Sequence, residues 1–159
     1  MTHQLSNRIS KKGLTVWRIY GLFQTLMTLA VASFVIWLTK KMDWPTWIIY
    51  VAIAIVIVEA FAAIYLFPKI RWMRWRYEVR ETEIELQHGL FIIHRTLIPM
   101  VRVQHVDTTQ GPLLRHYKLA VLTISTAATV HAIPAIPVDE ADELRRQISA
   151  LAKVAEDDV

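Results

Sequence analysis

Two long apolar stretches lie in the first half of the chain. Residues 19–39 contain no charged side chain, and residues 44–67 contain only one, Glu59. At about 1.5 Å per helical residue, either stretch can cross a hydrocarbon core of roughly 30 Å. Only residues 40–43 separate them, so the pattern predicts two antiparallel transmembrane helices in a tight hairpin, with Pro45 in the first turn of the second helix and Pro68 at its end.

After Pro68, apolar and polar positions alternate, which is typical of β-strands. The alternation predicts strands over 82–87, 90–98, a stretch including 101–105, 121–127 and 129–133, with a bend at Pro99 and a loop or short helix at 113–120. Pro134 and Pro137 are expected to end the sheet. Asp139 is expected to cap a terminal helix over 139–155. Its apolar stripe should pack on the sheet, and comprises Ala141, Leu144, Ile148, Leu151 and Ala155.

These elements predict an α+β membrane protein with three parts. They are a cytoplasmic N-terminal segment (1–18), a transmembrane hairpin (19–67) and a cytoplasmic, mostly β domain (68–159). The 159 residues are 54% hydrophobic, with a mean hydropathy of +0.32, and they include no cysteine. Disulfides, thiolate metal sites and cysteine nucleophiles are therefore excluded.

The net charge of +4 is concentrated beside the hairpin. Basic residues precede it (Arg8, Lys11, Lys12, Arg18) and follow it (Lys69, Arg71, Arg74, Arg76, Arg80), whereas the connecting loop holds Lys40 and Lys41. Because Lys and Arg resist translocation, both termini are expected in the cytoplasm, and the protein in the cell membrane as a multi-pass protein. All six tryptophans are expected near an interface. A cleaved signal peptide ending near residues 30–32 is the alternative, but the apolar run continues past that point.

Glu59 is the one ionisable residue inside a predicted span. Burying an unpaired carboxylate there is costly, so Glu59 should be protonated or paired. Folding the hairpin about residues 41 and 42 puts Gln24 at the same depth, with Thr25 and Thr28 as further donors nearby. We hypothesise a contact between Gln24 and Glu59 that fixes helix register. The alternatives are that Glu59 snorkels toward the interface, handles protons or ions, or docks a partner helix.

Several motifs in the β region resemble those of a known family. They are Ile98-Pro99-Met100-Val101-Arg102-Val103-Gln104-His105-Val106-Asp107, then Gly111-Pro112-Leu113-Leu114-Arg115, Leu119-Ala120 and the strand over 121–127. With the paired upstream helices, they resemble the bacterial pleckstrin-homology-like, membrane-flanked proteins, in particular the short YdbS-like members. The resemblance implies a bent antiparallel sheet capped by one C-terminal helix (a PH-like domain). It also implies a longer companion with several such domains, and protection of membranes against antimicrobial peptides in some relatives.

The sequence contains no motif of a known enzyme class. Nucleophile elbows, phosphate-binding loops, dinucleotide fingerprints and zinc spacings are all missing, so we expect no enzymatic activity, cofactor or metal. The six histidines are interpreted as surface or core residues. The position of the basic residues beside the spans argues against nucleic acid as a partner.

Two surfaces remain as candidates for binding. The first is the basic and aromatic run after the hairpin, which could bind anionic lipid or only anchor the helix end: Lys69, Arg71, Trp72, Arg74, Trp75 and Arg76. The second comprises Arg102, Gln104 and Arg115, which could face a partner or instead form ion pairs with Glu83 or Glu85.

The sequence therefore predicts a noncatalytic scaffold or binding module at the inner leaflet. Its expected partners are membrane lipids and a larger membrane protein with several PH-like domains, acting in envelope integrity or peptide resistance. The alternative is an accessory subunit of a transport or export complex. Self-association is left open by the sequence.

Overall fold

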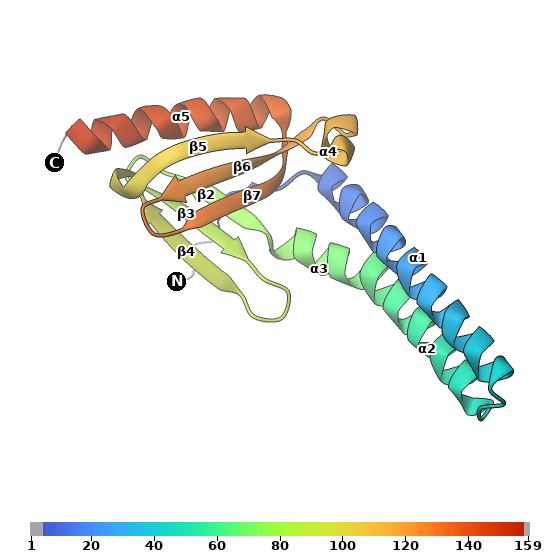
Figure 1. The fold of residues 1–159 in the computed structure, drawn as a ribbon. Helices are drawn as coiled ribbons and strands as arrows, with labels where there is room; N and C mark the ends of the chain where they lie inside the picture. Colours follow the sequence, from blue (N-terminus) through green and yellow to red (C-terminus); the bar gives the residue numbers. More distant parts are fainter. Residues whose placement is uncertain (1–4, 158–159) are drawn as a thin grey trace. The chain divides into compact units, whose positions relative to one another are not determined.

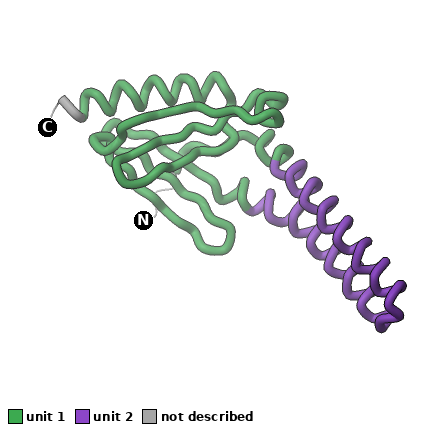
Figure 2. The backbone as a smooth tube through the Cα atoms, in the orientation of Figure 1, with its two compact units in different colours: residues 1–16, 71–159 green, residues 17–70 purple. Residues whose placement is uncertain are grey.

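The computed structural model describes residues 5–157 and divides the chain into two compact units. Unit 1 comprises Met1–Val16 and Arg71–Val159, and unit 2 comprises Trp17–Ile70 (Figure 2). The N-terminal segment therefore belongs to the same unit as the β domain. The sequence treated it as a separate part, and that boundary is different in the structure.

Unit 2 is a hairpin of helices. Helix α1 (Lys11–Lys41) begins in unit 1 and forms the first arm of the hairpin. The second arm is one continuous helix that consists of α2 (Trp47–Phe61), a π-helical turn (Ala62–Leu66) and α3 (Phe67–Arg74). Two stretches, Lys11–Lys41 and Trp47–Arg74, are long and apolar enough to cross a membrane. Both are longer than the predicted 19–39 and 44–67.

The second helix does not end at Pro68, contrary to the expectation from the sequence. Proline lacks the N–H that an α-helix needs, and its ring crowds the preceding turn. The π-helical turn widens the backbone just before it, and the Phe67 N–H bonds to the carbonyl oxygen of Ala62, five residues back. This wider turn lets the helix continue through Pro68 to Arg74.

Unit 1 contains two antiparallel sheets, shown in Figure 1. The first has the order β1-β2-β3-β4 and comprises β1 (Asn7–Arg8), β2 (Arg76–Val79), β3 (Glu83–His88) and β4 (His94–Pro99). The second has the order β5-β6-β7 and comprises β5 (Val103–Thr109), β6 (Leu119–Thr126) and β7 (Val130–Pro137). A 3₁₀ turn (Met100–Arg102) joins the sheets, α4 (Pro112–His116) joins β5 to β6, and α5 (Val138–Asp157) ends the unit.

The core of unit 1 follows the predicted alternation. In β3, Ile84 and Leu86 are buried, and α5 buries the first part of its predicted stripe, Ala141, Leu144 and Ile148. The N-terminal segment contributes Leu5, Ile9 and Val16, which are only 1%, 3% and 2% exposed. Asn7 and Arg8 also pair with Tyr77 and Arg76 of β2. Distant parts of the chain therefore share one core.

Three further boundaries differ from the prediction. Residues 90–93 form a loop rather than the start of a strand, so β4 begins at His94. Strand β7 continues through Pro134 to Pro137; it is an edge strand, where a missing N–H is tolerated. Helix α5 begins at Val138, which leaves Asp139 inside its first turn rather than at the cap.

Candidate functional site

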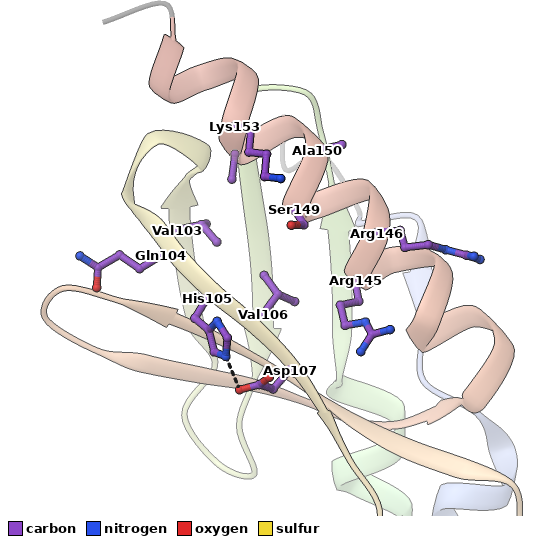
Figure 3. A pocket seen from close by; sticks show the side chains of 11 residues that line it. Val103, Gln104, His105, Val106, Asp107, Arg145, Arg146, Ser149, Ala150 and Lys153 are labelled. Atoms are coloured by element: carbon purple, nitrogen blue, oxygen red, sulfur yellow. Dashed lines mark ion pairs between the residues drawn. The ribbon is translucent and has the colours of Figure 1, made fainter.

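A groove runs between strand β5 and helix α5 (Figure 3). Its volume is about 710 Å³, and both elements belong to unit 1. Val103, Gln104, His105, Val106 and Asp107 line it from β5, and Arg145, Arg146, Ser149, Ala150, Ala152 and Lys153 line it from α5. Small side chains at 149, 150 and 152 leave this space between the helix and the strand.

Strand β5 has a strand neighbour on one side only. In the order β5-β6-β7, its other edge meets no strand of the described chain. An open edge offers backbone N–H and C=O groups to an added strand. Its pairing with β6 also shifts register between Val103 and His105, where a bulge interrupts the ladder. The groove therefore lies beside backbone that is able to pair with an extended segment.

The helix side of the groove is basic. Figure 3 shows Arg145 and Ser149 projecting from α5 toward β5, while Arg146 and Lys153 add two more cations to the lining. Arg145 forms a 3.6 Å ion pair with Asp142 one turn earlier in the helix. On the strand side, His105 Nε2 lies 3.0 Å from the Asp107 carboxylate. The lining thus holds three basic side chains and one carboxylate, although Arg146 projects away from β5 in Figure 3, and this excess of positive charge favours an anionic occupant.

The structure does not bring the predicted partner residues Arg102, Gln104 and Arg115 together. Gln104 lines the groove, although its amide points away from α5 in Figure 3. Arg102 ends the 3₁₀ turn. Arg115 lies on α4 and lines a separate hollow of about 290 Å³. Glu83 forms an ion pair with Arg80, and Glu85 forms ion pairs with Arg80 and Arg95. These two arginines occupy the glutamates that the sequence analysis offered as alternative partners of Arg102 and Arg115.

The residues of the basic and aromatic run after the hairpin differ in exposure and in the contacts they make. Lys69 and Arg71 are exposed. Trp72 donates its indole N–H to the carbonyl oxygen of Ile9 at 3.3 Å, and Arg76 donates to that of Leu5 at 3.4 Å. Both side chains therefore hold the N-terminal segment in unit 1, which the sequence pattern did not indicate.

Trp75 does not belong to an exposed lipid-binding surface. It is only 6% exposed, and its ring stacks on that of His88 with centroids 5.4 Å apart. Burial is the main reason that the pKa of His88 lies below its usual value of 6.5; the neighbouring His94, Arg71 and His131 lower it further. Within the described residues, no group of three or more His, Asp or Glu side chains could hold a metal ion.

Inside the hairpin, Gln24 and Glu59 are in contact. The Gln24 amide donates to Glu59 Oε1 at 3.0 Å, and Glu59 Oε2 has no hydrogen-bond partner among residues 5–157. Thr25 and Thr28, which the sequence suggested as further donors, bond instead to the carbonyl oxygens of Gly21 and Gln24. A hollow of about 490 Å³ lies beside the pair, and most of its lining is apolar, from α2, the π-helical turn and the start of α3.

Comparison with known proteins agrees with this architecture. The family model for the bacterial PH domain matches residues 21–152. The chain is 48% identical to the UPF0699 transmembrane protein YdbS of Bacillus subtilis (strain 168), over the full length of both chains. A 58-residue part, 36% of this chain, is 33% identical to the UPF0699 transmembrane protein YdbT of the same organism.

That part covers 12% of YdbT, which is therefore a longer protein. No solved structure matches the chain. The family match and the full-length likeness agree with two apolar helices, two antiparallel sheets and a C-terminal helix. The chain is a membrane protein that belongs to the bacterial PH domain family, as a YdbS-like member.

Proposed function

We propose that this protein is a noncatalytic scaffold whose PH-like domain docks a longer membrane protein of its own family through the groove between β5 and α5. The observation that carries the proposal is the open edge of β5 beside a basic helix face. An extended segment of the partner would add a strand to β5, so that main-chain hydrogen bonds provide affinity. Acidic side chains on that segment would face Arg145 and Lys153.

The orientation belongs to the same proposal. Both sequence flanks of the hairpin contribute to unit 1, which supports an even number of membrane crossings. Basic residues on both flanks favour the cytoplasmic side for that unit. Exposed Lys69 and Arg71 would then meet anionic headgroups of the inner leaflet. The process in which such a complex would act is envelope integrity or resistance to antimicrobial peptides.

Copurification tests the docking. The full chain is coexpressed with YdbT of Bacillus subtilis, the longer relative, and purified in mild detergent. Replacing Ala150 by Trp fills the groove, and we expect recovery of YdbT to fall about tenfold, the change that corresponds to about 1.4 kcal/mol. Gln147→Trp is the matched control, because Gln147 is exposed on the same helix but does not line the groove. Equal recovery with both variants, or none with the unmodified chain, would refute docking at this groove.

A second candidate is an accessory subunit of a transport or export complex. The observation that favours it is the Gln24–Glu59 pair beside an apolar hollow on the hairpin, which a partner helix could fill. Photocrosslinkers at positions 55–63 would distinguish the two. A single defined protein adduct supports the role as a transport subunit, whereas lipid adducts alone support the role as a scaffold.

A further inference from the structure

The loop between β3 and β4 exposes three consecutive large apolar side chains. Phe91, Ile92 and Ile93 are 77%, 71% and 52% exposed, although the loop belongs to unit 1 rather than to the hairpin. Single exposed apolar residues are common on protein surfaces, whereas a contiguous group of them is typical of a binding surface. The loop therefore presents a contiguous apolar surface.

The conformation of this loop is set by its own backbone. Gly89 has φ +139, in a region that side-chain-bearing residues rarely adopt, and a Cβ there would overlap the carbonyl oxygen of Ile92. The loop therefore folds tightly back on itself at Gly89. The exposed side chains project from a closed turn and not from an open, extended segment.

The loop is hydrogen-bonded to the last residue of α3. The Arg74 guanidinium donates to the carbonyl oxygen of Phe91 at 3.2 Å. Arg74 is the last residue of α3, and it lies four positions after Ile70, the last residue of unit 2. Four helical residues span about 6 Å. The loop is thus hydrogen-bonded to a residue that cannot lie far from the end of the hairpin.

The residues around this contact have the composition of a membrane-surface motif. Basic side chains at Lys69, Arg71 and Arg74 precede it in the chain, and the loop supplies aromatic and branched aliphatic groups. Basic groups bind anionic headgroups while apolar groups enter the boundary with the acyl chains. A lipid surface satisfies both requirements.

We propose that the β3–β4 loop inserts Phe91 and Ile92 into the leaflet at which the hairpin ends, as a third membrane contact after the two spans. The contact would fix the orientation of the PH-like domain on the membrane surface. It requires the hairpin to span a membrane but does not depend on docking at the β5–α5 groove.

Single cysteines test the proposal, because the chain has none of its own. The full-length variants Phe91→Cys and Ile92→Cys carry an environment-sensitive fluorophore, with one protein in each nanodisc of phosphatidylcholine and phosphatidylglycerol. Ala128→Cys is the control, since Ala128 is exposed at the turn between β6 and β7. Lipids brominated along the acyl chain should quench the label at 91 and 92 by about twofold, as expected for insertion of about 5–10 Å, and leave the label at 128 unchanged.

Two results would overturn the proposal. The first is quenching of the loop labels by aqueous iodide, equal to that at position 128, with no effect of brominated lipid. The second is a blue-shifted label that brominated lipid does not quench, because it would mean burial against protein. Ile93→Cys, which is less exposed, provides an independent position if either loop variant fails to fold.

Discussion

Gly21 lies against the backbone of Ala63 in the second helix of the hairpin, and an added methyl group there should force the two helices apart. A Cβ at this position would overlap the carbonyl oxygen of Ala63 and lie 2.8 Å from its carbon, whereas ordinary van der Waals contact begins at 3.4 Å. The backbones must therefore separate by about 1 Å, because the nearest obstacle is the carbonyl oxygen of the backbone and not a flexible side chain. Overpacking of this kind costs about 1–3 kcal/mol.

The sign of the effect makes Gly21→Ala informative. Helix propensity alone predicts that Ala stabilises the helix by about 1 kcal/mol relative to Gly. We expect the steric cost to exceed this gain and the variant to lose about 1–2 kcal/mol of unfolding free energy. SDS-induced unfolding in mixed micelles, followed by helical circular dichroism, measures the difference.

Gly111→Ala is the matched control, because a Cβ at Gly111 meets nothing within 4 Å. Its unfolding free energy should stay within about 0.5 kcal/mol of the unmodified protein. A Gly21→Ala variant as stable as the unmodified protein, or more stable, would refute the close helix contact.

Three further predictions concern single side chains. Tyr77→Phe should lower the unfolding free energy by about 1–2 kcal/mol in thermal melts, since the buried phenol donates a 2.5 Å hydrogen bond to Glu140 and burial is the first cause of its raised pKa. The pKa of His88 is lower in the folded protein than in the unfolded chain, so the unfolded chain binds the proton more tightly and the unfolding free energy should fall as the pH drops below 6.5. His88→Gln should flatten this dependence of the unfolding free energy on pH between pH 7.5 and 5.5. A double-mutant cycle of Gln24→Leu and Glu59→Leu in micelles should give a coupling of about 0.6 kcal/mol.

Each of these predictions has an exposed control. Tyr50→Phe removes a phenol that is 72% exposed and should leave the melt unchanged. His105→Gln replaces an imidazole that is 70% exposed and should keep the pH slope. For the membrane pair, a cycle of Gln24→Leu with Ser33→Ala should show no coupling. If a control variant changes the measured quantity as much as its test variant does, the corresponding contact is contradicted.

The hairpin was predictable because continuous apolar sequence has few alternatives to a membrane span. The depth match between Gln24 and Glu59 followed from counting residues around the turn. The end of the second helix was harder to predict, since the π-helical turn before Pro68 cannot be recognised in a hydrophobicity pattern. Likewise, Pro134 lies in a strand only because that strand is at the edge of its sheet, and edge position is a property of the tertiary fold.

The groove and the N-terminal strand could not be found from the sequence. Strand β1 has two residues, too few for any periodicity, and its partner Tyr77 lies 70 positions away from Asn7. The groove depends on a strand edge and on small residues one turn apart in α5, neither of which is unusual in itself. The basic run near Trp75 was visible, but the contacts that occupy Trp72 and Arg76 reach back to the first ten residues.

The shared core of unit 1 joins residues that are synthesised at different times. Val16 packs with Leu119 and Ala135, so the N-terminal segment emerges from the ribosome long before its partners do. At about 5–20 residues per second, the interval from residue 16 to residue 135 is about 6–24 s. During that time both spans must enter the bilayer while Leu5, Ile9 and Val16 lack their cover. This core can therefore form only after both sequence flanks of the hairpin have been synthesised.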